Sequence, residues 1–127
     1  MDITPLIPAG RQIVESYGEA RFRVSGRVHP GSILVFTDRT LALAAADMSA
    51  LDSEILAPVL EAGRAGTLEL LILGCGKRMA LVPAELRQTL RDAGVVVEAM
   101  DTGAACRTYN VLMAEGRRVA AALIAVS

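Results

Sequence analysis

Residues 68–126 of the chain read LELLILGCGKRMALVPAELRQTLRDAGVVVEAMDTGAACRTYNVLMAEGRRVAAALIAV, and this stretch decides the fold. It holds three short apolar segments, residues 68–73, 95–100 and 119–126. Apolar side chains on both faces of a segment are typical of a strand that is covered on both sides. We expect the three strands to share one sheet through right-handed crossovers, with residues 119–126 buried. The helices between them could cover one face of the sheet or be split between both faces.

Both connecting segments carry signals for the start and the end of a helix. The first segment opens with Pro83, which suits the first turn of a helix, and stops at Gly94, which suits the left-handed residue after one. The second begins at Asp101 or Thr102, either of which can cap the free amides, and ends before Gly116. The stretch therefore predicts a βαβαβ unit.

The segments before residue 50 are short and bounded by turns, which predicts an antiparallel meander. A hairpin is expected around the GEA tripeptide, and the turns HPG and TDRT precede two further strands. The expected strands are residues 12–17, 21–25, 32–36 and 41–45.

Residues 52–65 show helical spacing of apolar residues, interrupted by Pro58. Proline lacks a backbone donor, so Pro58 either lies in the first turn of a late-starting helix or kinks an earlier one. The whole pattern predicts an α/β fold in one domain, residues 1–127, with the antiparallel meander ahead of the βαβαβ unit. A length of 127 residues and a hydrophobic fraction of 53% are ample for one core.

The composition argues against several classes of function. A net charge of -1 and an aromatic content of 3% give no field and few stacking platforms for nucleic acid. The longest apolar run, residues 119–126, is too short for a membrane-spanning helix. The N-terminal sequence MDITPLIPAGRQ lacks the basic and apolar regions of a secretion signal, so we expect a cytoplasmic protein. One histidine and two cysteines do not make a plausible metal site, and no metal or cofactor is expected.

A candidate ligand site lies where two of the predicted strands end. The glycine-rich turn GCGKR follows residues 68–73, and residues 101–107 follow residues 95–100. The carboxyl ends of neighbouring parallel strands meet at one rim, where open α/β sheets bind ligands. The turn lacks the spacing of a P-loop or of a dinucleotide-binding fingerprint. The candidate binding residues are Gly74, Cys75, Gly76, Lys77, Arg78, Asp101, Thr102, Cys106 and Arg107.

The two cysteines have a reactive and an inert interpretation. A helix N-terminus near Cys106, and the cations Lys77 and Arg78 near Cys75, would lower the pKa of each thiol. The simpler interpretation makes Cys106 a small buried residue and Cys75 a loop thiol, because free cysteines are commonly packing residues. We expect no structural disulfide between them even if they are neighbours, since the cytoplasm is reducing.

Three further polar residues need an explanation. Arg107 lies within the first turns of its helix, where the macrodipole opposes a cation, so we expect a carboxylate partner, Glu98 or Asp101, or a bound anion. Tyr109 is expected to be a core-facing ring with its hydroxyl at a polar edge. His29 stands in the HPG turn without a nucleophile beside it, so we expect it at the surface and predict no catalytic residue.

The stretches LELLILGCGKRM and VVVEAMDTGAACRTYNVLMAEGRRVAAALI resemble a family of small domains of unknown function. That family includes the mitochondrial complex I assembly factor 3 and the adipogenesis-associated homologue. The run from Asp101 to Asn110 is specific to it, whereas Cys75 stands where the family more often has threonine. The resemblance implies a three-layer, mixed-sheet fold of the Mth type. It carries no catalytic residues over to this chain.

Two functions of different classes follow. The first is a non-enzymatic binding or assembly module with a protein partner, linked to a respiratory complex by the resemblance alone. The alternative is a site for a small molecule, an anion or thiol redox chemistry on the rim formed by residues 74–78 and 101–107. The sequence leaves the oligomeric state open.

Overall fold

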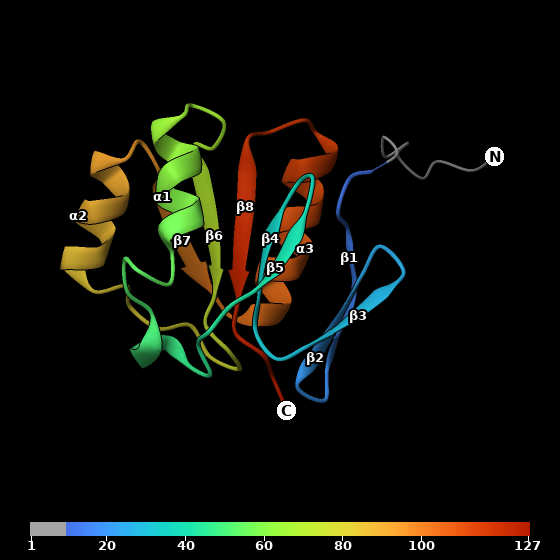
Figure 1. Cartoon of the computed structure of the whole chain (residues 1–127). Coiled ribbons are helices and arrows are strands. Elements are labelled where there is room, and N and C mark those ends of the chain that lie inside the picture. Colours follow the sequence, from blue (N-terminus) through green and yellow to red (C-terminus); the bar gives the residue numbers. More distant parts are fainter. Residues whose placement is uncertain (1–9) are drawn as a thin grey trace.

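The computed structural model describes residues 10–127, so the targeting prediction, which rests mainly on residues 1–9, lies outside the described residues. These described residues form two sheets and three α-helices (Figure 1). The smaller sheet contains β1 (Val14–Gly18), β2 (Arg21–Val24) and β3 (Arg27–Pro30). The larger sheet contains β4 (Ile33–Phe36), β5 (Thr40–Ala42), β6 (Leu70–Gly74), β7 (Val96–Met100) and β8 (Val119–Leu123). The helices are α1 (Ala57–Arg64), α2 (Ala84–Asp92) and α3 (Thr102–Ala114), with a 3-10 turn at Met48–Ala50.

Strand β8 is the centre of the larger sheet, whose order is β5-β4-β8-β6-β7. It pairs in parallel with β6 and antiparallel with β4, while β6 pairs in parallel with β7. All five residues of β8 are buried, at no more than 2% exposure. The prediction that the three apolar segments share one sheet, with the last of them buried, is confirmed.

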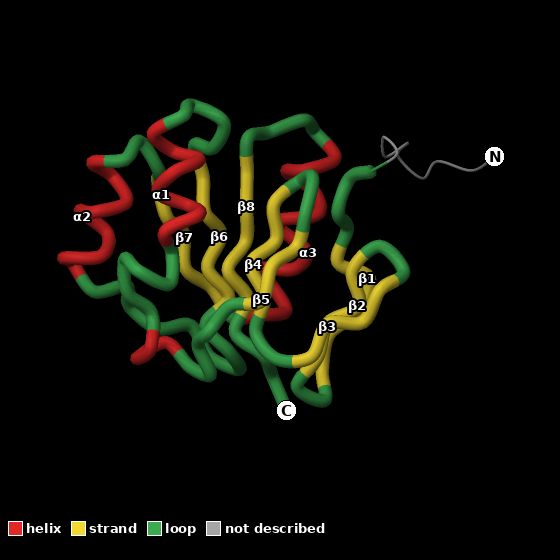
Figure 2. Tube along the Cα trace, viewed as in Figure 1, coloured by secondary structure: helices red, strands yellow, loops and turns green. Residues whose placement is uncertain are grey.

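The helices are split between the two faces of the larger sheet. Helices α1 and α2 pack on one face, and α3 packs on the other together with the smaller sheet (Figure 2). Right-handed crossovers explain the split. The connections β5 to β6 and β6 to β7 run in one direction across the sheet, whereas β7 to β8 runs back, so its helix lies on the opposite face. The result is the expected three-layer α/β fold.

The N-terminal meander is divided between the two sheets. The predicted HPG turn is instead the end of β3, where His29 pairs with Phe22 in an antiparallel ladder. The chain leaves the smaller sheet at Gly31, whose φ of 75° suits glycine, and β4 and β5 then join the larger sheet. The antiparallel meander expected from the sequence is confirmed in β1, β2 and β3, and the β4–β5 pair is antiparallel as well. This pair lies in the larger sheet because β4 also pairs with the distant β8.

Strand β7 differs from its prediction as a strand covered on both faces. It forms an edge of the sheet, and Val96 is 57% exposed while Val97 is buried. Helix α3 lies mainly over β6 and β8, so it leaves this face of β7 open. The guanidinium of Arg87 on α2 donates to the carbonyl of Val97 at 3.2 Å. This backbone carbonyl of the edge strand therefore has a hydrogen-bond partner.

The predicted helix signals act as expected. Pro58 lies in the first turn of α1, which confirms the late-starting helix. The side chain of Asp101 accepts from the backbone N–H of Ala104 at 2.9 Å and so caps α3. Gly94 and Gly116 follow α2 and α3 with φ of 85° and 79°, the left-handed conformation that ends many helices.

Substituting Ala121 tests the tight packing of β8. Ala121 is fully buried beneath α3 and the smaller sheet, so Ala121→Leu should overpack this core and cost about 1–3 kcal/mol of stability. Ala84→Leu adds the same atoms at an exposed position of α2 and should change stability by less than about 0.5 kcal/mol. Urea unfolding followed by circular dichroism measures both, and equal stability of the two variants would contradict the packing described.

Candidate functional site

The predicted rim is closed by main-chain hydrogen bonds. The connection after β6 leaves toward one face of the sheet, and the connection after β7 leaves toward the other. In an open α/β sheet, a crevice forms between two such strands at their carboxyl ends. Here the N–H of Cys75 donates to the carbonyl of Met100 at 2.8 Å, and the N–H of Thr102 donates to the carbonyl of Gly76 at 2.8 Å. The two loops that would line a crevice are therefore joined to each other.

Thr102 completes this closure from within the core. Its side chain is fully buried, and its hydroxyl accepts from the N–H of Gly76 at 2.9 Å and donates to the carbonyl of Ile124 at 2.8 Å. Gly74 leaves room for α3, since a Cβ atom there would lie 3.0 Å from the Cα of Thr102. The amides of Cys75 and Gly76, which a glycine-rich turn could offer to an anion, are both already bonded.

The structure separates the predicted site residues into three places. The core of the rim contains five of them: Gly74, Cys75, Gly76, Asp101 and Thr102. Lys77 and Arg78 lie exposed on the loop that leaves the rim. Cys106 and Arg107 line a separate recess of about 250 Å³ between β1 and α3. The predicted ligand site on the rim stays a hypothesis.

The two cysteines lie on opposite faces of the larger sheet. Cys75 packs against the core beneath α1 and α2, whereas Cys106 belongs to the core beneath α3 and is 4% exposed. Burial raises the pKa of the Cys106 thiol to about 12, and this outweighs the favourable charge of Arg107. Cys106 is thus the small buried residue of the simpler interpretation.

Arg107 corrects one prediction. Its side chain is exposed, and between residues 10 and 127 it makes no ion pair and no side-chain hydrogen bond. The expected pairing with Glu98 or Asp101 is therefore wrong. Because Arg107 is open to water, hydration of its charge offsets the unfavourable interaction with the positive end of the helix dipole. A carboxylate partner is therefore not needed.

Tyr109 and Asn110 attach the smaller sheet to α3. The ring of Tyr109 is fully buried, as predicted, and its hydroxyl donates to the carbonyl of Gln12 at 2.8 Å. Burial raises the pKa of this phenol above its ordinary range. The amide of Asn110 bonds both backbone groups of Val14, at 2.8 and 2.9 Å. The polar run on α3 is therefore largely structural.

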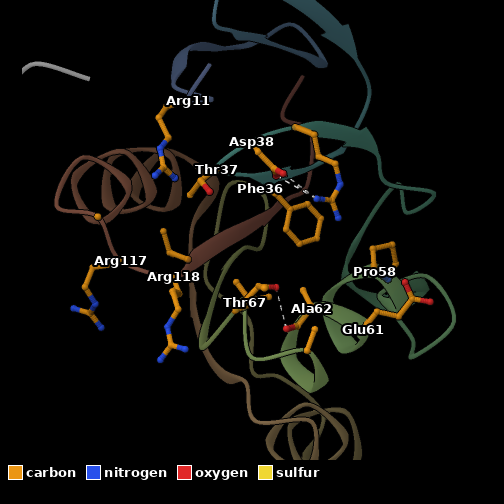
Figure 3. Close-up of a pocket in the computed structure, with 15 residues that line it drawn as sticks. Arg11, Phe36, Thr37, Asp38, Pro58, Glu61, Ala62, Thr67, Arg117 and Arg118 are labelled. Carbon is orange, nitrogen blue, oxygen red and sulfur yellow. Dashed lines mark hydrogen bonds and ion pairs between the residues drawn. The ribbon is translucent and has the colours of Figure 1, made fainter. Parts of the chain in front are cut away.

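A cleft of about 720 Å³ opens at the other end of the larger sheet, away from the rim. It lies between the β4–β5 turn, α1 and the starts of β6 and β8. Figure 3 shows Phe36 and Arg11 on the β4 side, Pro58 and Glu61 on α1, and Arg117 and Arg118 before β8.

The cleft combines an apolar floor with charged walls. Apolar side chains of Phe36, Leu68 and Val119 line it, and four arginines stand around it: Arg11, Arg39, Arg117 and Arg118. Two carboxylates, Asp38 and Glu61, also line the walls.

Several of these arginines are held in place. Arg39 contacts Asp38 at 3.1 Å and lies over the Phe36 ring, with 4.2 Å from its guanidinium carbon to the ring centroid. Arg117 and Arg118 share the one carboxylate of Glu69, at 3.6 and 2.8 Å, so this group keeps a net positive charge. The cleft can therefore receive an apolar group together with a carboxylate or another anion.

Sequence reasoning missed the cleft because its walls come from four distant segments. The only local signals are the charged turns TDR and EGRR, each of which is ordinary for an exposed turn. The antiparallel pairing of β4 with β8 brings these turns to the same end of the sheet, and it joins segments as far apart in the chain as Ile33 and Leu123.

Three further observations describe the chemical groups within the described residues. Within residues 10–127, no three His, Cys, Asp or Glu side chains are grouped as a metal site would need. The thiol of Cys106 and the phenol of Tyr109 are both buried with raised pKa values, which disfavours their ionised forms.

Within residues 10–127, no helix has the length and apolar composition needed to cross a membrane.

The chain belongs to the family described as "Protein of unknown function (DUF498/DUF598)", whose profile matches residues 14–124. An uncharacterized protein of Rhodobacter capsulatus is 38% identical over 116 residues, covering 91% of this chain and 86% of that protein. NADH dehydrogenase (ubiquinone) 1 alpha subcomplex assembly factor 3 of Danio rerio is 46% identical over 57 residues. That match covers 45% of this chain and 33% of the assembly factor. The resemblance seen in the sequence is confirmed.

Solved structures of relatives share the whole fold. An outer membrane protein from Bartonella henselae superimposes with a TM-score of 0.86 at 36% identity, covering 93% of this chain and 98% of that one. A Bordetella pertussis protein described as a Mth938-like domain gives 0.82 at 28% identity, covering 100% and 95%. The Mth-type fold expected from the sequence is confirmed.

Thr102 provides a test of the closed rim. Thr102→Val keeps the shape but leaves the N–H of Gly76 and the carbonyl of Ile124 without a partner, which should cost about 1–3 kcal/mol. Thr102→Ser keeps the hydroxyl and should lose less stability than the valine variant. Urea unfolding compares the two, and a valine variant as stable as the serine variant would show that these bonds do not hold the rim.

The cysteines provide a second test, based on thiol counting in anaerobically prepared protein. Cys75 is partly exposed and should react with a thiol reagent in the native protein, whereas Cys106 should react only after unfolding. Denaturation without reductant should release two thiols, because the residues lie on opposite faces of the sheet. Two thiols that appear only after dithiothreitol is added would reveal a disulfide and contradict this arrangement.

Proposed function

We propose that this protein is a binding module that holds a segment of another protein during the assembly of a larger complex. The observation that carries the proposal is the cleft with an apolar floor and four arginines around it. Protein interfaces are enriched in arginine and aromatic side chains, and their core anchors are apolar groups in pockets. The partner segment would present an apolar side chain next to carboxylates.

The charges in the cleft support a protein segment as the ligand. Arginines and carboxylates line the same cleft, so its occupant needs an anionic group near Arg39 or Arg117 and tolerates a cation near Glu61. The cleft is a partly open hollow in the surface and not an enclosed cavity. Such an open surface suits a chain that passes through it.

The relatives point to the kind of complex. Assembly factors of NADH dehydrogenase match nearly half of this chain, although the match spans only about a third of their own length. We therefore extend the proposal to the assembly of the NADH dehydrogenase of the native host. The expected location is the cytoplasm, in line with the sequence analysis.

The proposal can be tested by affinity capture from the native host, with soluble and membrane fractions analysed separately. Two variants change the cleft at exposed positions: Ala65→Glu adds a carboxylate, and Arg117→Glu reverses a charge. Each should lower recovery of the partner by about tenfold or more, the effect of about 1.4 kcal/mol in binding. A strain without the gene can be complemented with each variant in turn. On native gels, the cleft variants that lose the partner should also give less assembled NADH dehydrogenase.

Matched substitutions outside the cleft serve as controls. Ala84→Glu and Arg91→Glu introduce the same changes at exposed positions of α2 and should behave like the unaltered protein. If the cleft variants capture the partner as well as the controls do, the cleft is not the binding site. If loss of the gene leaves assembly of the respiratory enzyme unchanged, the extension to that complex is wrong.

A further inference from the structure

We propose that the groove between β3 and β5 binds a tetrahedral oxyanion, such as the phosphate group of a small molecule. The groove has a volume of about 370 Å³ and lies where the edges of the two sheets approach each other. Its lining residues are Gln12, Val24, Ser25, Arg27, His29, Arg39 and Thr40. The proposal goes beyond the proposed function, which uses the neighbouring cleft, and the two sites share Arg39.

The charged side chains that line the groove are basic, and Asp38, which contacts Arg39, is not among the lining residues. The lining of the groove includes two arginines and the single histidine but no carboxylate, in contrast to the cleft, where Asp38 and Glu61 contribute. Arg27 makes no ion pair with any residue from 10 to 127. A group of cations without a carboxylate between them lowers the energy of an anion and repels a cation.

Strand β3 presents two of these donors on one face. Arg27 and His29 are two residues apart, so their side chains point the same way from an extended strand, and both line the groove. Arginine offers five N–H donors, and histidine offers at least one in either protonation state. The pair thus supplies donors from one wall.

Arg39 supplies donors from the opposite wall in a fixed position. Its Nη1 atom contacts Asp38 at 3.1 Å, and its guanidinium lies over the ring of Phe36. These contacts use one nitrogen and one face of the group, which leaves the other N–H groups for a ligand. Fixed guanidinium groups bind phosphate oxygens through paired, charge-assisted hydrogen bonds.

Neutral side chains hold the remaining walls. The hydroxyl of Thr40 donates to Oε1 of Gln12 at 2.8 Å, which orients the amide and leaves its N–H groups to donate. The hydroxyl of Ser25 donates to the carbonyl of Arg11 at 3.1 Å and accepts from the N–H of Ile13 at 3.0 Å. The volume exceeds that of phosphate alone and leaves space for a small organic group.

The test is an NMR titration of the whole chain with inorganic phosphate, with chloride at equal ionic strength as the reference. Phosphate should produce saturable shifts at His29, Arg27 and the amides around Thr40. Arg27→Ala and His29→Ala should each weaken phosphate binding, the arginine variant by about tenfold or more because it removes charged hydrogen bonds. Arg91→Ala, which removes an exposed arginine on α2, should bind phosphate as the unaltered protein does.

Two results would overturn the proposal. One is the lack of any saturable response to phosphate up to about 10 mM, a weak affinity even for a small ligand. The other is a response that chloride reproduces or that Arg91→Ala weakens as much as Arg27→Ala does. Amide spectra of each variant establish that it is folded. Because Arg27 and His29 lie outside the cleft, their variants should still capture the protein partner, which separates the two proposals.

Discussion

The requirement to cover both faces of β8 shapes the rest of the structure. Its sequence VAAAL has no polar residue, and strands on both sides and elements above and below exclude it from water. Apolar area left in water would cost about 25 cal/mol per Å². On one face, Ala120 and Ala122 belong to the core cluster that also contains the apolar side chains of α1 and α2.

The second face needs more than one helix, because α3 covers β6 and β8 but leaves Ile33 and Val35 of β4 beside it. The smaller sheet fills this space with Phe22 and Val24. Polar groups of α3 then hold the sheet in place, through the hydroxyl of Tyr109 and the amide of Asn110. The polar residues that interrupt the apolar pattern of α3 thus serve the docking of the second sheet.

The same packing places the two proposed binding sites at one end of the larger sheet. Close approach of α3 at Gly74 and the buried hydroxyl of Thr102 join the two loops of the rim, where the predicted ligand site stays a hypothesis. The cleft opens at the opposite end, where Arg39, Arg117 and Arg118 are each about half exposed. The cleft and the groove at this end share Arg39, so a ligand bound in one is expected to change the affinity of the other for its own ligand.

The sequence by itself determined the elements with strong local signals: the apolar strands of the βαβαβ unit, the helix caps at Asp101 and Gly94, and the core position of Tyr109. These features depend on side-chain periodicity and on backbone preferences within a few residues. Only the tertiary structure decided that the meander divides between two sheets, that β7 is an edge, and that Arg107 needs no carboxylate. It also decided that Arg39 and Arg118 line one cleft. These outcomes depend on the pairing of β4 with β8 and on which strand lies outermost, and such long-range contacts leave no periodic trace in the sequence around each residue.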